Sequence, residues 1–246
     1  DEISMDHMWG PRVNIIVSQG DYERLADEIR ALLRAELPPQ FQGFATTWMT
    51  PGVDVMSTKE KILYSVGVTT VSRALRFCGG AEALPLHDVD WLRVSEQHLL
   101  EFTNGVVHRD DTGELTRARE ALAYYSDDVL RFLLMCGWNT VGGDYFPIGR
   151  IGARGDLLGL QIQAAKVAQH LMRLGFMVSK KYWTYKKWFG TLFARLPIAA
   201  ELSPVLKALL REEDWRRVEL HIWDGAAIIL RHQNALGIAP AAHQHQ

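Results

Sequence analysis

The segment DLLGLQIQAAKVAQHLMRLGFMVSKK, residues 156–181, decides how the second half of the chain folds. It contains no proline, and Leu160, Val167, Leu171 and Leu174 recur in it at spacings of seven, four and three residues. Those spacings place the four side chains on one face of an α-helix of about seven turns. A helix this long buries such an apolar face against other helices, so the segment predicts a helical bundle.

Helical patterns also flank this segment on both sides. Ser95 and Ser126 are favourable N-caps, and each is followed by a helical pattern. Further helices are predicted at residues 115–124, 185–195, 203–210 and 214–236. We therefore predict one helical bundle domain at residues 91–240, followed by a frayed tail at residues 241–246.

The first 90 residues have a different pattern, in which β-branched segments alternate with helical ones. Residues 12–17, RVNIIV, predict a strand, and a helix capped by Asp21 is predicted to follow and to end before Pro38. Short strands are also predicted, and they lie at residues 41–48, 53–56 and 62–71. The predicted fold class is α+β, with a mixed sheet and helices at residues 1–90 and the bundle after them. The interface between these two domains is the natural place for a ligand cleft.

Composition narrows the classes of protein to which the chain could belong. The formal net charge of −2 over 246 residues argues against a bulk nucleic-acid binder. No apolar run approaches the roughly 20 residues that span a bilayer, so we expect no membrane partner. Two cysteines cannot form a disulfide framework or a four-cysteine zinc site, which favours a reducing compartment and a cytoplasmic localisation. The opening residues lack a starting methionine, and we expect that an N-terminal piece precedes them.

The segment SMDHMWGPR, residues 4–12, is the most distinctive in the first half. Asp6 stands shortly before a predicted strand, where it could bind a metal ion at the mouth of the sheet, and Arg12 could contact an anion. In the alternative interpretation, which the spacing alone favours, the segment is a tight turn. Trp9 would then fill a gap in the core, and Asp6 would be a turn or cap residue.

A second distinctive segment, KKYWTYKKWF at residues 180–189, contains four lysines and five aromatic residues. At helical spacing, Lys180, Trp183 and Lys187 would share one side. Lysines that hold a phosphate tail and aromatic faces that stack on a base would account for this composition. An amphipathic helix with its aromatic residues packed inside and its lysines solvated would account for it equally well.

Residues 142–155 are predicted to form a glycine-rich break between helices. Gly149, Gly152 and Gly155 have a Gly-x-x-Gly-x-x-Gly spacing, but no Gly-Lys-Ser/Thr follows and no strand precedes them, so this is not a phosphate-binding loop of known type. Arg150 could bind an anion at the start of the long helix. The favoured interpretation is a loop that lets two helices turn closely, with Arg150 and Asp156 as candidate residues of the cleft.

Two further features carry charge in or near predicted helices. Arg173 interrupts the apolar run of the long helix, and its head either extends to solvent or enters the cleft. Residues 87–98 bring several acids and imidazoles together, which suggests a metal site. We favour another interpretation, in which Asp90 caps a helix, while Glu96 and His98, two residues apart, point in different directions.

The motif Ser-x-Asp-His-x-Trp-Gly-Pro-Arg-Val at residues 4–13 resembles an uncharacterised bacterial family related to the polymerase-β-like nucleotidyltransferases, which include antibiotic-modifying enzymes. Later segments carry the same resemblance, and they are residues 22–25, 124–129, 149–152, 169–176, 186–191 and 234–237. The resemblance spans nearly the whole chain. It implies a nucleotidyltransferase-like domain at residues 1–90 and a helical domain that faces the nucleotide.

The resemblance also implies a reaction, in which a nucleotidyl group passes from a nucleoside triphosphate to a hydroxyl or amine of a small molecule. Mg²⁺ or Mn²⁺ would be the metal, Asp6 would hold it, and His7 beside it would be the other catalytic candidate. The residues implied to contact the nucleotide are Arg12, Arg150, Trp183, Lys186 and Lys187. We expect a nucleotide and a small-molecule acceptor as partners, and a homodimer is possible.

The sequence departs from the superfamily pattern at the metal site. Met8 stands where a second acid is expected, and residues 62–71 contain no acid, so hard cations have few ligands here. One alternative is therefore a non-catalytic protein on the same fold that senses a nucleotide or binds a protein. Another is an enzyme that hydrolyses phosphate in the same cleft. The sequence specifies neither the acceptor nor the base.

Overall fold

The computed structural model of the chain describes residues 12–38, 40–46, 66–77 and 84–242. The fold class is α+β, mostly helical, with little strand. The chain divides into two compact units, of which the first comprises Asp1–Ala83 and His108–Ala118 and the second comprises Leu84–Val107 and Arg119–Gln246. Among the described helices, none has both the length and the apolar composition that crossing a bilayer requires.

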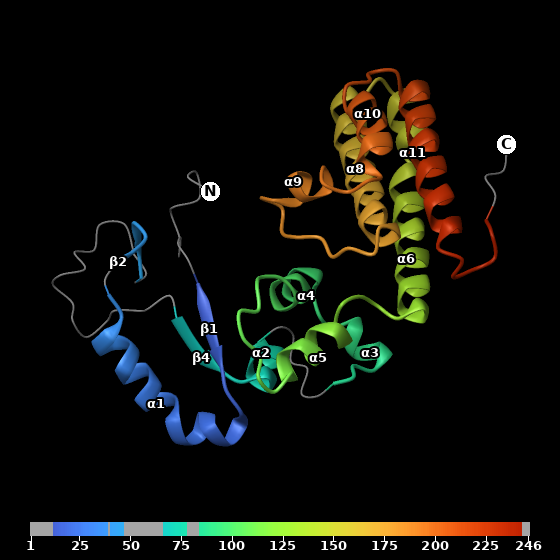
Figure 1. Cartoon of the computed structure of the whole chain (residues 1–246). Coiled ribbons are helices and arrows are strands. Elements are labelled where there is room, and N and C mark those ends of the chain that lie inside the picture. The colour runs from blue at the N-terminus through green and yellow to red at the C-terminus, as the bar shows by residue number, and fades with distance from the viewer. Residues whose placement is uncertain (1–11, 39, 47–65, 78–83, 243–246) are drawn as a thin grey trace. The chain divides into compact units, whose positions relative to one another are not determined.

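The described part of the first unit is built around two parallel strands. Strand β1 (Val13–Ile16) pairs with β4 (Val66–Thr69), so that Val13 lies opposite Val66 and Ile16 lies opposite Thr69. Parallel neighbours need a long connection, and helix α1 (Gln19–Glu36) lies in that connection and beside β4 (Figure 1). The remaining elements are the antiparallel pair β2 (Gln40–Phe41) and β3 (Phe44–Ala45), and helix α2 (Val71–Phe77).

Several of the predictions for this unit can be compared with the described elements. The strand predicted at residues 12–17 is confirmed, but Asp21 is not the cap of the following helix. Ser18 is the N-cap, since its hydroxyl accepts a hydrogen bond from the Asp21 N–H at 3.1 Å, and Asp21 lies in the first turn. The short strands predicted after it are found in part, as β2, β3 and β4, while residues 53–56 lie outside the described residues.

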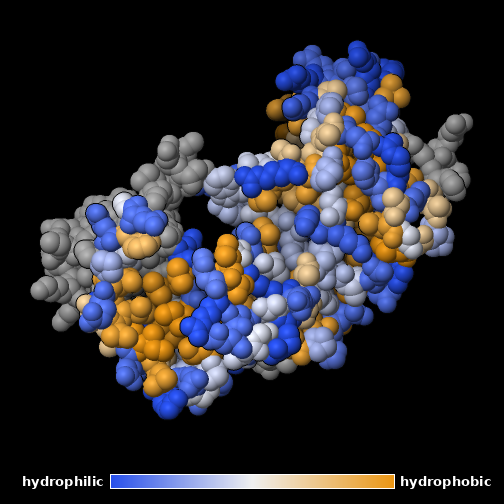
Figure 2. All heavy atoms as spheres, viewed as in Figure 1, coloured by the Kyte–Doolittle hydropathy of each residue, from blue (hydrophilic) through white to orange (hydrophobic). Residues whose placement is uncertain are grey.

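Apolar side chains gather on the surface of this unit over α1 and the two strands (Figure 2). Val13 is 50% exposed and Leu32 is 60% exposed, whereas Ala26 is the buried residue of α1. The described elements of the first unit therefore cover only part of the apolar surface that they carry.

The second unit is a helical bundle around helix α8 (Figure 1). Its long helices are α6 (Asp127–Tyr145), α8 (Leu157–Val178), α10 (Ala199–Leu209) and α11 (Trp215–Ala235). The four leucine and valine residues that predicted the bundle, Leu160, Val167, Leu171 and Leu174, are each at most 1% exposed. The shorter helices of this unit are α3 (Asp88–Trp91), α4 (Glu96–Thr103), α7 (Ile148–Ala153) and α9 (Phe189–Phe193). Helix α5 (Glu114–Ala121) begins in the first unit and ends in the second.

Side-chain caps begin four of these helices, α4, α6, α8 and α11, and the two caps predicted at Ser95 and Ser126 are confirmed. Ser95 and Ser126 accept hydrogen bonds from backbone N–H groups in the first turns of α4 and α6. The prediction that Asp90 caps a helix is confirmed in part, because Asp90 forms a capping box at the start of α3, although His87 is the N-cap. Asp90 instead lies three residues inside, where its carboxylate accepts a hydrogen bond from the His87 N–H at 3.2 Å.

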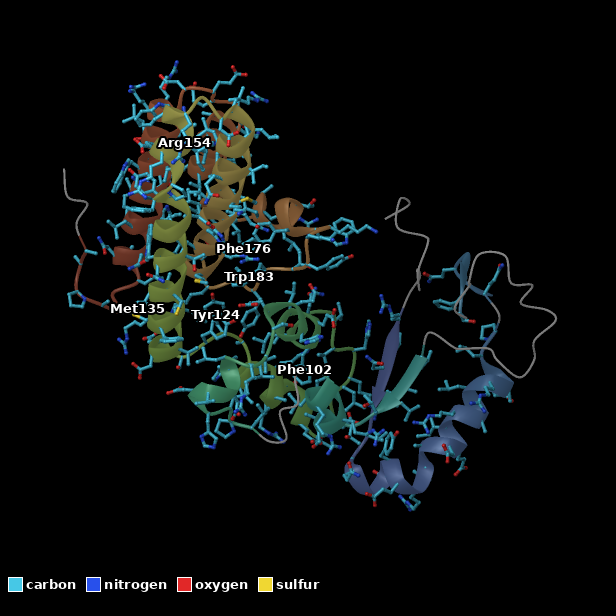
Figure 3. The ribbon with its side chains drawn as sticks, turned by 180° about the vertical axis from the view of Figure 1, so that it is seen from behind. Phe102, Tyr124, Met135, Arg154, Phe176 and Trp183 are labelled. Atoms are coloured by element: carbon cyan, nitrogen blue, oxygen red, sulfur yellow. The ribbon has the colours of Figure 1, made fainter. Side chains whose placement is uncertain are left out.

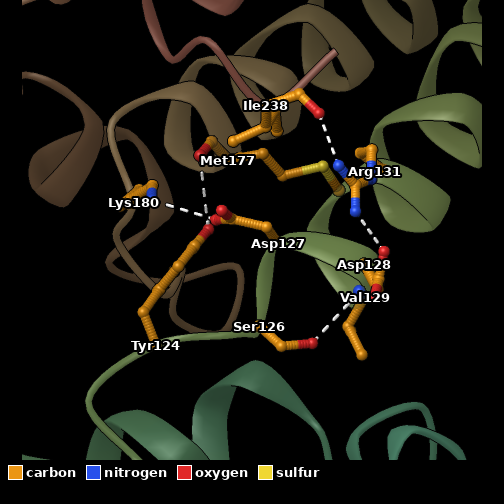
Figure 4. Close-up of polar contacts among 9 residues, drawn as sticks. All are labelled: Tyr124, Ser126, Asp127, Asp128, Val129, Arg131, Met177, Lys180 and Ile238. Carbon is orange, nitrogen blue, oxygen red and sulfur yellow. Dashed lines mark hydrogen bonds and ion pairs between the residues drawn. The ribbon is translucent and has the colours of Figure 1, made fainter.

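Polar contacts join the start of α6 to distant parts of the second unit (Figure 4). The Arg131 guanidinium donates to the backbone carbonyl of Ile238 at 2.6 Å, and Lys180 lies 3.4 Å from the Asp127 carboxylate. The Tyr124 hydroxyl donates to the carbonyl of Met177 at 3.4 Å. These contacts hold the ends of α6, α8 and the C-terminal segment together.

The glycine-rich break predicted at residues 142–155 is mostly helical. Gly142 and Gly143 lie inside α6, and α7 occupies residues 148–153. The glycines of α7 serve close packing, because a Cβ on Gly152 would lie 2.2 Å from the Cβ of Trp215 on α11. Only Gly155, with a φ of +71°, has the left-handed backbone conformation that a sharp turn into α8 needs.

We predict that Gly152→Ala destabilises the protein, because the added methyl group overlaps the Trp215 side chain and forces the two helices apart. The expected loss is about 1–3 kcal/mol in the free energy of unfolding, measured by urea denaturation. Gly190→Ala in α9 is the matched control, since a Cβ there meets nothing within 4 Å. If both variants unfolded at the same urea concentration as the wild type, the packing role of Gly152 would be refuted.

Candidate functional site

The lysine- and aromatic-rich segment is not helical over most of its length, contrary to the prediction. Helix α8 ends at Val178, Lys180 has a φ of +49°, and helix α9 begins only at Phe189. Residues 181–185 lack regular secondary structure, and a turn follows at residues 186–188. Lys180, Trp183 and Lys187 therefore do not share one side of a helix.

Buried hydrogen bonds explain why this segment leaves the helical conformation. Tyr182 and Thr184 are buried, and their hydroxyls donate to the Leu122 carbonyl at 2.9 Å and to the Gln97 side-chain oxygen at 2.7 Å. The same Gln97 oxygen accepts a hydrogen bond from the Tyr185 N–H at 2.9 Å. These anchors fix the backbone of the segment against α4 and against the end of α5.

Between and after these anchors, the segment presents charged and aromatic side chains outward. Lys181, Tyr185, Lys186 and Lys187 are exposed, and Trp183 is half-buried. Among the described residues, neither Lys186 nor Lys187 forms an ion pair within 4.0 Å. The lysines are therefore available to a negatively charged ligand.

Arg173 of α8 lies next to Trp183. The guanidinium carbon is 5.8 Å from the centroid of the Trp183 ring, which is within the range of a cation–π contact. Its Nε atom is buried and has no hydrogen-bond partner among the described residues. A buried donor without an acceptor is costly, and such a group usually marks a position where a water molecule, ion or ligand binds.

Glu96, at the start of α4, is an acid whose carboxyl interacts electrostatically with Arg173. Burial raises the pKa of its carboxyl above the usual 4.5, while hydrogen bonding and the positive charge of Arg173 act in the opposite direction. The Tyr125 hydroxyl donates to a Glu96 carboxylate oxygen at 3.3 Å. Glu96 therefore ionises less readily than an exposed glutamate.

Four aromatic rings, one of which carries the hydroxyl that donates to Glu96, pack together here. The Tyr125 ring lies 4.9 Å from Tyr124, 5.3 Å from Tyr182 and 5.5 Å from Trp91, in each case edge to face. Burial, together with the nearby Glu96, raises the pKa values of the three tyrosine hydroxyls far above the usual 10. The tyrosines are therefore neutral hydrogen-bond donors at physiological pH. We refer to Trp91, Glu96, Tyr124, Tyr125, Arg173, Tyr182 and Trp183 as the Glu96–Arg173 cluster.

The structure brings some of the predicted site residues together and leaves others apart. Trp183, a member of the Glu96–Arg173 cluster, lies on the same short segment as Lys186 and Lys187. Asp6 and His7 lie outside the described residues, so their roles as metal ligand and catalytic residue stay predictions. Arg12 is exposed directly before β1 in the first unit.

Arg150 lies at the other end of the bundle. It is on α7, where its guanidinium stacks 4.5 Å from the centroid of Phe146, just after α6 ends. In Figure 3, the neighbouring Arg154 lies at the opposite end of the bundle from Tyr124 and Trp183. The helical unit thus does not place Arg150 beside Lys186 and Lys187.

Sequence reasoning noticed Arg173 and Glu96 but did not connect them. They are 77 positions apart, and no spacing rule links two helices that are so far separated in the chain. The available signal was the cation in an apolar helical run, which needs a partner when it is buried. Tyr124 and Tyr125 were noticed only as part of a resemblance.

Residues 91–189 match a family model described as a domain of unknown function, DUF4037. This match supports an uncharacterised family, and it covers a shorter part of the chain than the resemblance noted from the sequence. Every residue of the Glu96–Arg173 cluster, together with Lys186 and Lys187, lies inside the matched range. No curated protein and no solved structure matches the chain.

We predict that replacing Glu96 with Gln changes how stability depends on pH. The folded-state pKa of Glu96 is raised, so the folded state binds its proton more tightly, and the wild type loses stability as pH rises through the unfolded and then the folded pKa. Glu96→Gln removes this titration and keeps an acceptor for Tyr125. In urea unfolding between about pH 4 and pH 7, the free energy of unfolding of the variant should increase relative to that of the wild type as pH rises. A constant difference over that range would contradict the assignment.

Proposed function

We propose that the protein is a nucleotidyltransferase-like protein that binds a nucleoside triphosphate, and that its helical unit contacts the ligand through Arg173, Trp183, Lys186 and Lys187. The observation that carries this proposal is the buried Arg173 Nε, which has no acceptor among the described residues. The resemblance of the sequence to the nucleotidyltransferases is the reason for proposing a nucleoside triphosphate as the ligand.

Arg173 suits a phosphate better than it suits its protein neighbours. A guanidinium carries five donors in a planar fork, which matches the oxygens of a phosphate. Glu96 would be the natural partner, but its burial raises its pKa and no hydrogen bond joins it to Arg173 among the described contacts. A phosphate oxygen at the Nε would satisfy the donor and neutralise the charge.

Trp183, Lys186 and Lys187 complete a binding surface on the same segment. An exposed tryptophan face can stack on a base or another ring, and lysines act as mobile point charges for a phosphate tail. At 4 Å in water each charge pair is worth only about 1 kcal/mol, so several cations are needed to hold a triphosphate. The hydrogen bonds of residues 182–185 hold in place the backbone that carries these side chains.

The proposed reaction, if the protein is catalytic, forms a bond from an acceptor hydroxyl or amine to the α-phosphorus and breaks the bond to pyrophosphate. The acceptor loses its proton to solvent. Mg²⁺ or Mn²⁺ would neutralise the phosphates, with Asp6 as its proposed ligand and His7 as the other catalytic candidate. Metal ions need converging oxygen ligands, and the acids that accompany Asp6 are not identified.

A specific observation favours a second candidate, a non-catalytic nucleotide sensor or protein-binding module on the same fold. Met8 replaces an expected acid, and β4, with the sequence VGVT, contains no acid. A sensor needs the phosphate contacts but not the metal ligands. Asp6→Asn should then leave nucleotide affinity unchanged, whereas an enzyme should lose affinity in the presence of metal. Product analysis with labelled triphosphate separates transfer from hydrolysis.

We predict that the double variant Lys186→Glu and Lys187→Glu lowers nucleoside triphosphate affinity by at least about tenfold, because two attractive charges become repulsive. The measurement is calorimetric titration of the full chain with ATP, CTP, GTP and UTP, with Mg²⁺ and with Mn²⁺. The matched control reverses two other exposed lysines, Lys166 on α8 and Lys207 on α10. Absence of binding by the wild type to all four nucleotides would refute the proposal.

We also predict that Arg173→Lys weakens binding although it keeps the charge, because an ammonium cannot reproduce the planar fork. The expected loss of affinity is about tenfold, one hydrogen bond to a charged group being worth about 1.5–3 kcal/mol. Arg154→Gln, at the far end of the bundle, should bind as the wild type does. Equal affinities for Arg173→Lys and the wild type would show that Arg173 does not contact the ligand.

A further inference from the structure

One face of α6 is exposed and combines large apolar side chains with glycines. Its residues recur every three or four positions and so share a side of the helix. They are Phe132, Met135, Asn139, Gly142, Gly143 and Phe146, and all are exposed. We refer to these six residues as the α6 face. The opposite side of the helix, with Leu130, Leu134 and Val141, is buried in the bundle.

The α6 face has large apolar side chains at one end and two exposed glycines near the other. Phe132 is 46% exposed and Met135 is 59% exposed, so both project from the first half of the helix. Gly142 and Gly143 carry no side chain, and a Cβ on either would meet nothing within 4 Å. Glycines inside a helix cost about 0.5–1 kcal/mol each relative to alanine. The packing within the described residues of this unit does not require them, and they leave open space on the α6 face.

The α6 faces of two copies of the chain are complementary to each other when the two α6 helices run antiparallel. A two-fold axis through Asn139 places each Met135 opposite Gly143 of the partner, so that the side chain enters the space which the glycine leaves. The same axis places Phe132 opposite Phe146. Isologous contacts of this kind, in which residue i meets j and j meets i, are typical of homodimers.

The charges beside the α6 face follow the same symmetry. Asp128 is exposed one turn before Phe132, and Arg150 stacks on Phe146 at the other end. An antiparallel pair brings Asp128 of one copy toward Arg150 of the other. Asp128 already binds Arg131 on its own helix, but a carboxylate has acceptor sites for a second cation.

We propose that the α6 face is the contact surface between two copies of this chain. The occupant is a second α6 that runs antiparallel around a two-fold axis at Asn139. This inference is independent of the proposed nucleotide site, whose residues lie on α8 and on the segment after it and include none of the α6 face. One helix pair is a small interface, so the dimer dissociates on dilution.

Sedimentation equilibrium of the full chain tests the proposal. The wild type should be dimeric at roughly 100 µM and dissociate at lower concentration. Met135→Asp should weaken the dimer at least tenfold, since it places a charge against the partner's apolar surface. Ile162→Asp is the matched control, because Ile162 is 52% exposed on α8, away from the α6 face, and it should dimerise as the wild type does. Circular dichroism checks that both variants are folded.

Disulfide trapping tests the position of the two-fold axis. In a background with Cys78 and Cys136 replaced by Ser, Asn139→Cys should oxidise to a covalent dimer, because the two Cα atoms approach within the roughly 7 Å that a disulfide allows. Ile162→Cys should stay monomeric after oxidation. A wild type that is monomeric at every concentration, or a dimer that is unaffected by Met135→Asp, overturns the proposal. If the wild type is monomeric, the partner of the α6 face is a different protein and not a second copy of this chain.

Discussion

The burial of one apolar face of α8 is the interaction on which the second unit depends. Leu160, Val167, Leu171 and Leu174 are almost completely buried against α6, α10 and α11. Burying one such side chain contributes about 1.5–3 kcal/mol, and α8 has more buried residues than any other described helix. It also fixes the rotation of α8 about its axis, and hence the direction in which every other residue of the helix points.

That rotation is what makes Arg173 unusual. Arg173 lies one residue before the buried Leu174, and its Nε is carried out of water together with the apolar face. The segment that leaves α8 then passes beside it, because Tyr182 and Thr184 hydrogen-bond to Leu122 and Gln97. The path of the chain after α8 therefore places Trp183 beside the half-buried Arg173, with the exposed Lys186 and Lys187 on the same segment. The matched family range contains all of them, although it assigns them no role.

The elements that could be predicted are those whose signals are local. A serine before a helical pattern accepts hydrogen bonds from the next turn whatever surrounds it, so the starts of α4 and α6 were correct. The glycine-rich segment was misread, because glycine favours turns locally but also permits close packing of helices. Only the position of Trp215 on α11 shows that Gly152 serves packing. The segment after α8 was misread as a helix, because its buried anchors come from α4 and the end of α5.

The sequence by itself determined the class of the second unit and the approximate extents of α8 and α11, since apolar spacing and caps act within a few turns of chain. It also singled out the lysine- and aromatic-rich segment as a place for an anionic ligand. Only the tertiary structure decided which charged groups meet there, because Glu96 and Arg173 belong to helices brought together by packing. Pairings between distant segments depend on the rotation of each helix, and that rotation is set by the whole core.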